Sequence, residues 1–442
     1  MGGSTVRRGN AVSAVPPPAR SRRALLTAVV LAAAAGLVVT LWRPTAPPLL
    51  GTPTELSAFH PDLLARVAAY RGSQRLMALL ALLLSVAVPV LALVVPATRW
   101  RLVALARRGR PAIGAALAVV AVVVAIDVVT LPLDVWIGWF HEREWGFAAG
   151  SLRLWLRDRL VGLVLRVLIA VVAAVAVRAL AARAADTWQH WLVLLATVAV
   201  GVLVLLQPLV VQPLFLSTEP LSPGPVREAV AEVLAAAGEF ELGIDVGDAS
   251  RRTTRVNAFV TGLGPSRRVV LYDTLLELPP DQVAYVVAHE LAHREHRDLP
   301  RGILLTATAA VPVVWVLRRL WEHPRVEALR SSAGGQARLL PMAALVVLVL
   351  ATWVGTPLAN AVSRRAEAAA DHRALELTGE PAVQIAVNRV FVERDLADPT
   401  PPAWVTALWG THPPTGARIQ AAVDHAVRYG LPLPALDEVQ GR

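Results

Sequence analysis

Long apolar runs are the feature that most constrains how this chain can fold. Seven runs follow one another: Ala24–Trp42, Leu76–Pro96, Ala112–Pro132, Leu160–Leu180, Trp191–Leu209, Gly302–Leu317 and Leu339–Val354. A helix needs about 20 apolar residues to cross the hydrocarbon core of a bilayer. The first five runs have about that length. The last two are shorter, so length alone allows them to be buried or re-entrant. The pattern predicts a mainly α-helical bundle of several membrane spans.

The composition agrees with a membrane location. Hydrophobic residues make up 55% of the chain, and the mean hydropathy is +0.53. The formal net charge is +10, and every basic residue is an arginine. Because the arginines are scattered between apolar runs, they indicate contact with lipid headgroups rather than with nucleic acid. We therefore expect the lipid bilayer as a partner and no nucleic acid.

The N-terminal residues 1–23 are rich in Gly, Ser, Pro and Arg, which predicts a disordered tail. A signal peptide is the alternative interpretation of the next segment, Ala24–Trp42. That run is long for a signal peptide, however, and no small-residue cleavage site follows it. We expect it to be a retained span.

A zinc-binding motif lies in the segment Asp281–Asp298. Its apolar residues recur with a helical period, which places His289 and His293 one turn apart on one helix face. Two neutral imidazoles at this spacing bind zinc, and the intervening Glu290 serves as a general base toward the attacking water. The alternative is a surface helix whose histidines are only solvated.

A third protein ligand must come from elsewhere in the chain. His296 lies on the same face as His289, but it is displaced by about 10 Å along the helix axis at 1.5 Å per residue. Glu367, in an Ala-rich segment of helical pattern, is the best donor. Asp371 lies one turn later and could accept a hydrogen bond from a ligand imidazole, which would fix its tautomer. An ordinary charged helix face is the alternative for this segment.

Several segments together resemble a known family. They are AHELAHREHRD around the zinc motif, Asn257–Leu276, SRRAEAAAD around Glu367, and Thr411–Ile419. Leu131–Phe147 and Gly247–Phe259 are similar too, so that the resemblance covers roughly residues 55–422. The family is that of the integral-membrane CAAX prenyl proteases, which are zinc metallopeptidases. One departure is Ala368 after Glu367, where relatives commonly carry an aromatic residue.

The resemblance implies further site residues and partners. It places Asn257, Ala258 and Phe259 on a sheet edge that binds the substrate as an added strand. An internal strand without substrate contact is the alternative. It also places His412 and Arg418 near the reacting carbonyl, where they would stabilise the oxyanion or the substrate. The implied cofactor is one Zn²⁺ per chain, and the implied substrate is a peptide or protein that is membrane-associated or lipidated.

The expected domain organisation follows from these features. After the tail come spans one to five (24–216), a catalytic insert with the edge strand and the zinc helix (217–300), spans six and seven (301–356), and the C-terminal part of the catalytic domain (357–442). Within the insert we expect a helix at Pro225–Gly238 and strands at Gly243–Val246, Thr254–Thr261 and Arg268–Tyr272. The fold class is thus a mainly α-helical, multi-span bundle that carries a gluzincin-type zinc protease domain with a small β-sheet. The resemblance implies about seven spans.

Two features leave alternatives open. Asp127 and Arg166 fall inside apolar runs, so they either pair with each other or line a chamber within the membrane. The arginine distribution would place the zinc helix outside the cell, whereas the family resemblance implies the opposite side. Following the resemblance, we expect a multi-pass protein of a prokaryotic cell membrane with its catalytic side in the cytoplasm.

The sequence therefore predicts a membrane-embedded zinc metalloendopeptidase similar to the CAAX prenyl proteases. A quality-control protease for membrane proteins, with the same chemistry, is one alternative. A transporter or channel with a structural zinc is another, but structural zinc sites fill all four positions with protein ligands. Two histidines and one glutamate leave one position open, which favours catalysis.

Overall fold

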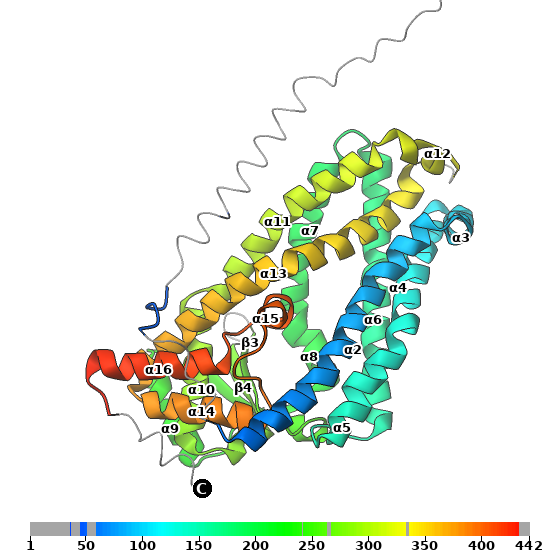
Figure 1. Cartoon of the computed structure of the whole chain (residues 1–442). Coiled ribbons are helices and arrows are strands. Elements are labelled where there is room, and N and C mark those ends of the chain that lie inside the picture. Colours follow the sequence, from blue (N-terminus) through cyan, green and yellow to red (C-terminus); the bar gives the residue numbers. More distant parts are fainter. Residues whose placement is uncertain are drawn as a thin grey trace, which may run out of the picture.

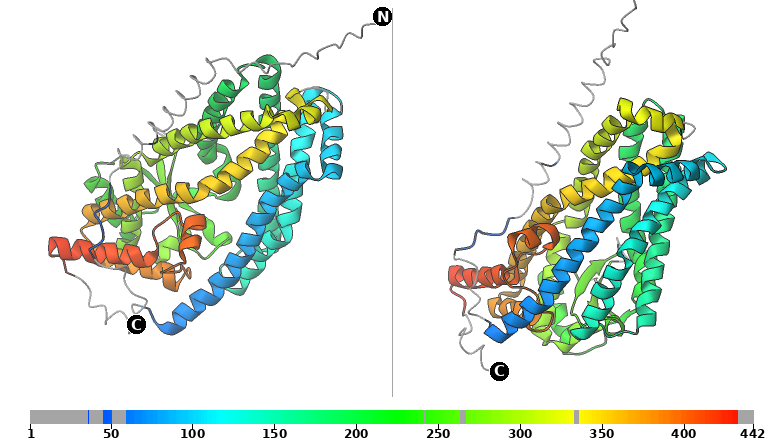
Figure 2. Two further views of the ribbon diagram at one scale, coloured as in Figure 1. Left: turned by 45° about the horizontal axis from the view of Figure 1, so that its top comes forward. Right: turned by 45° about the vertical axis from the view of Figure 1, so that its right-hand side comes forward.

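The computed structural model describes residues 36, 45–50, 59–240, 242–262, 267–332 and 336–432. This part of the chain is mainly helical, with one small sheet (Figure 1). Long helices form one part of the molecule, and the sheet and most of the shorter helices gather at one end of them (Figures 1 and 2).

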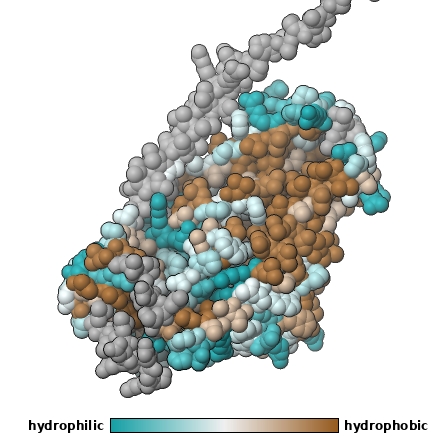
Figure 3. All heavy atoms as spheres, viewed as in Figure 1, coloured by the Kyte–Doolittle hydropathy of each residue, from teal (hydrophilic) through white to brown (hydrophobic). Residues whose placement is uncertain are grey.

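Six helical segments of the described chain are long and apolar enough to cross a membrane. Four of them begin with α2 (Pro61–Val94), α4 (Pro111–Val135), α6 (Leu152–Arg183) and α7 (Trp188–Leu206), and the other two are α11 (Asp298–Trp321) and the greater part of α13 (Gln336–Thr378). The span of α4 continues through the π-helical turn Trp136–His141 and α5 (Glu142–Glu144), and the span of α7 continues to Phe215. Their outer surface is largely apolar (Figure 3). The multi-span helical fold is therefore confirmed. The remaining expected run, Ala24–Trp42, lies outside the described residues except for Gly36.

The longest helix connects the membrane with the catalytic region. α13 has 43 residues and continues through Pro341 and Pro357, which gives it a length of about 65 Å at 1.5 Å per residue. Its apolar first part packs among the spans, and its last turns carry Glu367 and Asp371. One continuous helix therefore spans the membrane and positions the expected third ligand.

The sheet has four strands in the order β1-β2-β4-β3. They are β1 (Thr218–Pro220), β2 (Gly243–Gly247), β3 (Ala258–Thr261) and β4 (Arg268–Tyr272). β2 and β4 are parallel, and the other two pairs are antiparallel. Among the described strands, β3 is an edge strand and pairs with β4. It is shorter than the expected Thr254–Thr261, because the backbone of Thr253 and Thr254 pairs instead with Ala148 and Phe147 of the membrane part.

Arg255 joins the membrane part to the catalytic part. Its guanidinium donates to Glu142 at 3.0 Å and to the carbonyl of Asp395 at 2.9 Å. It also lies 3.9 Å from the ring centre of Phe147, in a cation–π contact. Glu142 ends the second described span and Asp395 follows α14 (Pro381–Glu393), so this side chain connects three distant segments.

Asp127 and Arg166, which lie inside spans, pair with each other. Arg166 on α6 donates to Asp127 on α4 at 2.5 Å. Arg159 also contacts Asp127, at 3.3 Å, and forms an ion pair with Asp134. Pairing lowers the cost of keeping ionised groups within a span. The structure thus shows the first of the two alternatives considered for Asp127 and Arg166.

The close approach of α3 (Pro96–Arg107) to α4 requires a glycine. A Cβ at Gly114 would lie 2.2 Å from the carbonyl oxygen of Ala106, whereas a Cβ at Gly201 on α7 would meet nothing within 4 Å. We expect Gly114→Ala to lower the free energy of unfolding by about 1–3 kcal/mol through overpacking. Gly201→Ala should leave it unchanged or slightly higher. Thermal melting of the two variants in detergent checks this, and equal melting temperatures would contradict it.

Candidate active site

The helix α10 (Pro280–Glu295) carries the zinc-binding motif. It begins with Pro280 at its first position, and Pro279 occupies the N-cap. Proline suits the first helical position because its fixed φ matches the helix and its missing N–H needs no partner there. The apolar face of α10 is buried against the sheet, α9 (Pro225–Ala236) and α13. This packing fixes the direction in which His289 and His293 point.

His289, His293 and Glu367 come together as a group that could hold a metal ion. One ligand atom of each lies within 4.8 Å of the others. The Nε2 atoms of the two histidines are 3.2 Å apart, and Oε2 of Glu367 lies 3.1 Å from Nε2 of His289 and 3.5 Å from Nε2 of His293. The spacing along α10 and the end of α13 therefore place two nitrogen donors and one oxygen donor around one point.

A second carboxylate stands behind each imidazole. Asp371 Oδ1 lies 2.9 Å from Nδ1 of His289, and Asp298 Oδ2 lies 2.9 Å from Nδ1 of His293. These contacts orient the rings so that both Nε2 atoms face Glu367. Asp371 was expected in such a position, but Asp298 was not. The signal for it was weak: an acidic residue five positions after His293, at the start of an apolar run.

Asp298 reaches His293 because the chain turns sharply between two helices. Arg297 adopts the left-handed conformation, with φ 54°, between the end of α10 and the start of α11. Non-glycine residues seldom adopt this conformation. The turn brings the first residue of a membrane-spanning helix back against the metal-binding group. One of the two carboxylates behind the imidazoles thus belongs to a span.

The electrostatics of this group favour a positive charge between the three side chains. Burial alone would lower the pKa of His293, but its hydrogen bonds to Asp298 and Glu367 raise it to about 10. The pKa of His289 is also raised, because its contacts with Asp371 and Glu367 outweigh burial. Two protonated Nε2 atoms cannot face each other at 3.2 Å without repulsion. A single divalent cation between the three side chains would accept the lone pairs of both Nε2 atoms and would offset the negative charge of Glu367.

Glu290 lies beside this group at the wall of a cleft. Burial raises the pKa of Glu290, and the neighbouring His289 and His293 partly offset that effect. A raised pKa suits a residue that accepts and then returns a proton. The cleft has a volume of about 680 Å³ and extends from His289 and Glu290 to Ala78 on α2 and to Ile137 next to α4.

The C-terminal segment supplies two further expected residues. His412 follows α15 (Ala403–Trp409) and lies with Nδ1 2.7 Å from Oε2 of Glu367; its side chain is 53% exposed. Arg418 lies on α16 (Thr415–Tyr429) and is buried, and it donates two hydrogen bonds to Asp371, at 2.8 and 2.6 Å. His412 therefore faces the cleft, whereas Arg418 holds the carboxylate behind His289.

The remaining residues considered in the sequence analysis fall into two groups, those that line the cleft and those that lie outside it. Asn257 and Ala258 line the cleft. Phe259, the next residue, packs edge-on against Tyr272 with ring centres 6.3 Å apart. His296 is buried at the C-terminal end of α10 and is not part of the metal-binding group, as its displacement along the helix axis predicts.

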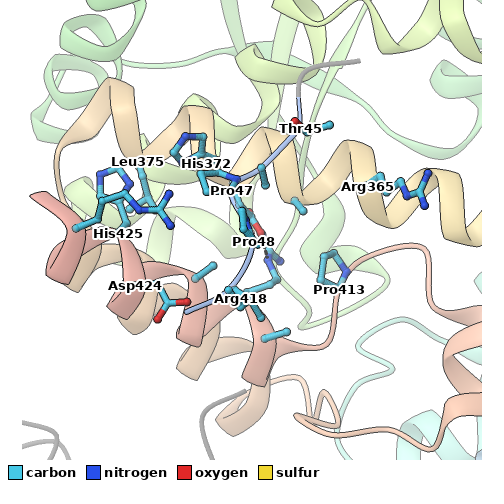
Figure 4. Close-up of a pocket in the computed structure, with 17 residues that line it drawn as sticks. Thr45, Pro47, Pro48, Arg365, His372, Leu375, Pro413, Arg418, Asp424 and His425 are labelled. Carbon is cyan, nitrogen blue, oxygen red and sulfur yellow. Dashed lines mark hydrogen bonds and ion pairs between the residues drawn. The ribbon is translucent and has the colours of Figure 1, made fainter. Parts of the chain in front are cut away.

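A second cavity lies behind the Asp371–Arg418 ion pair, with a volume of about 400 Å³. The segment 45–49 crosses it between α13 and α16, with Pro47 and Pro48 near its centre (Figure 4). Leu50 N donates to Asp424 of α16 at 2.7 Å. The N-terminal segment therefore packs against the same two helices that hold Glu367 and Arg418.

Comparisons with known proteins agree with this architecture. The sequence model of peptidase family M48 matches residues 222–426, and the model of the CAAX prenyl protease N-terminal region, with five membrane helices, matches residues 52–217. The chain belongs to peptidase family M48. It is accordingly an integral, multi-pass membrane metalloendopeptidase, and M48 peptidases act on peptides or proteins.

Individual relatives of this M48 peptidase come from bacteria and eukaryotes. The uncharacterized metalloprotease YhfN of Bacillus subtilis is 27% identical over 66% of this chain and 70% of its own length. A CAAX prenyl protease 1 homolog of Oryza sativa is also 27% identical, over 67% of this chain and 70% of its own. The crystal structure of S. mikatae Ste24p shares the fold, with a TM-score of 0.71 at 18% identity, and the match covers 91% of this chain and 96% of that one.

The position of Asp298 generates a prediction. Asp298→Asn should weaken metal binding by about 10–100-fold, because the amide orients the ring of His293 less well and does not support its basicity. Asp281→Asn makes the same chemical change in the exposed first turn of α10 and should leave metal binding unchanged. Competition with a chelator measures both affinities. Equal affinities of the two variants would contradict the role given to Asp298.

Proposed function

We propose that this M48 peptidase is a zinc endopeptidase that cleaves a peptide bond in a membrane-associated substrate. The observation that carries the proposal is the placement of His289, His293 and Glu367 around one point, with Glu290 beside them in a cleft. Zinc suits this donor set, since it binds imidazole and carboxylate in tetrahedral sites. Three protein donors leave one position for the reactants.

Glu290 is the proposed general base. When bound, zinc acts as a Lewis acid that polarises the scissile carbonyl and makes the attacking water more acidic. Glu290 takes the proton of that water and passes it to the leaving amine. Burial raises the pKa of Glu290, which favours acceptance of the proton and stabilises the protonated carboxyl until the proton passes to the amine.

His412 and Arg418 have different proposed roles. The ring of His412 borders the cleft next to Glu367 and can donate a hydrogen bond to the oxyanion that develops on the carbonyl. The guanidinium of Arg418 is engaged by Asp371 through two hydrogen bonds. Arg418 therefore supports His289 through Asp371 and acts as a positioning residue.

The edge of the sheet is the proposed binding site for the substrate backbone. In the part of the chain that the structure describes, no strand pairs with the outer edge of β3, and Asn257 and Ala258 at its start line the cleft. A peptide added along this edge would run toward Glu290. We propose that Phe259 contributes by packing on Tyr272, which holds the edge strand in place.

The lining of the cleft supports a membrane-associated substrate. Ala78 and Ile137 of the membrane part line it together with Val405 and Trp409 of α15. These apolar side chains fit a hydrophobic residue or a lipid group on the substrate. Relatives are named CAAX prenyl protease or protease HtpX homolog. On this basis we include a prenylated chain end among the proposed substrates.

The proposed mechanism predicts the outcome of one conservative change. Glu290→Gln keeps both imidazoles and Glu367, so zinc content should stay near that of the parent protein. Peptidase activity should fall by about 10²-fold or more, because an amide cannot accept a proton from water. Zinc analysis and cleavage of a peptide by the purified variant measure the two effects. Full activity in preparations free of contaminating proteases would disprove the role of Glu290.

The assignment of the third ligand predicts a contrast between two variants. Glu367→Ala removes the only oxygen donor of the group, so bound zinc and cleavage should both be lost. His296→Ala removes a buried imidazole outside the group and should leave the zinc stoichiometry near one per chain. Metal analysis of both proteins distinguishes them. Zinc retained by the Glu367 variant and lost from the His296 variant would overturn the assignment.

A further inference from the structure

A stripe of polar side chains runs along one face of α13. Its four members are spaced by four, three and four residues, which places them on one side of a helix. Each of them contacts the C-terminal segment between Thr406 and Arg418. They are Asn360, Arg364, Glu367 and Asp371. The last two belong to the metal-binding group and its support, and the first two lie two turns and one turn before Glu367.

Asn360 and Arg364 bind the C-terminal end of α15. Nδ2 of Asn360 donates to the carbonyl of Ala407 at 2.9 Å. Nη1 of Arg364 donates to the carbonyls of Thr406 and Gly410, at 2.8 and 2.6 Å. Carbonyls at the end of a helix lack partners within the helix. α15 lies beside α13 (Figure 1), so side chains of the longer helix supply these partners. The contacts hold the backbone of α15 and do not depend on its side chains.

The turn after α15 brings two of these carbonyls to one nitrogen. N–H of Gly410 donates to the carbonyl of Thr406 at 3.1 Å, and Nη1 of Arg364 contacts both carbonyl oxygens. The turn is so tight that a Cβ at Gly410 would lie 2.8 Å from the carbonyl oxygen of Thr406 and 3.0 Å from its Cα. A glycine is therefore required where the backbone meets the guanidinium.

His412 follows this anchored turn by two residues. Four residues separate Gly410 from the first residue of α16, and two of them are Pro413 and Pro414. Prolines donate no backbone hydrogen bond, and they restrict the conformation of the residue before them. The bond from Arg364 to Gly410 therefore fixes the backbone just before His412, whose ring contacts Glu367.

We infer that Arg364, with the help of Asn360, is a positioning residue for His412. Arg364 and Glu367 lie about one turn apart on α13, so one rigid helix sets both the oxygen donor of the metal-binding group and the place of the His412 ring. The same contacts hold Val405 and Trp409 of α15 at the wall of the cleft. The inference rests on the proposed role of His412 toward the oxyanion, and it goes beyond that role by naming what aligns this ring.

Hydrogen exchange of the purified full chain tests the positioning without a readout of activity. In Arg364→Met, the amides of residues 405–412 should exchange at least about fivefold faster than in the parent protein, because the turn loses its anchor. Zinc content should stay unchanged, since the three donors remain. Arg365→Met makes the same change at the exposed neighbouring residue and should exchange like the parent. Equal exchange of residues 405–412 in the two variants would overturn the inference.

A double-mutant cycle tests whether Arg364 acts through His412. With one quenched fluorogenic peptide for all variants, Arg364→Met should lower kcat at least about tenfold, which is less than the roughly 10²–10³-fold loss of an oxyanion donor. In a His412→Ala background the same change should lower kcat less than about twofold, because residues that act as a unit are not additive. A tenfold loss in both backgrounds would show a merely structural role and contradict the inference.

Two milder variants complete the cycle. A lysine can donate to both carbonyls from one nitrogen, so Arg364→Lys should keep at least about half of the parent kcat. Asn360→Ala removes one of the three hydrogen bonds and should lower kcat by about threefold, again only while His412 is present.

The outcomes separate the inference from the proposed function. A loss of kcat in His412→Ala with none in Arg364→Met would overturn the inference alone. Full activity of His412→Ala would disprove the oxyanion role of His412 and the inference with it. The role of Glu290 is tested independently by Glu290→Gln.

Discussion

The contact between Glu367 and the two imidazoles of α10 is the interaction on which the catalytic region depends. It brings a carboxylate and two nitrogen lone pairs together in a largely buried place, with Asp371 and Asp298 behind the rings. Such an arrangement is costly unless a cation occupies its centre. Metal binding and folding of this region are therefore coupled. The rest of the catalytic region serves to hold α10 and α13 at this distance.

Both helices are tied to the membrane part. α13 is continuous with a span, and the first residue of α11, another span, is Asp298. Arg255 adds a third connection through Glu142 and Asp395. A change in the packing of the spans would thus move two of the carboxylates at the site. The cleft itself extends from Glu290 to side chains of the membrane part.

Features that depend on local periodicity were predictable from the sequence. The six described spans follow from apolar length, and the facing positions of His289 and His293 follow from the helical period. The approach of Glu367 was predictable because its chemistry and its helical context left few rivals. By contrast, Asp298 depends on one left-handed residue, Arg297, which has no sequence signal. The three-residue β1 is too short to show alternation, and β3 is shortened by pairing with a distant segment.

We propose that α10 and α13 jointly hold one metal ion. Anomalous diffraction from crystals of the full chain, measured on both sides of the zinc absorption edge, would locate this ion. We expect one zinc peak per chain at about 2.0–2.2 Å from Nε2 of His289, Nε2 of His293 and a carboxylate oxygen of Glu367, with no fourth protein ligand. A peak bound by His296 in place of Glu367, or a fourth protein ligand closing the site, would contradict it.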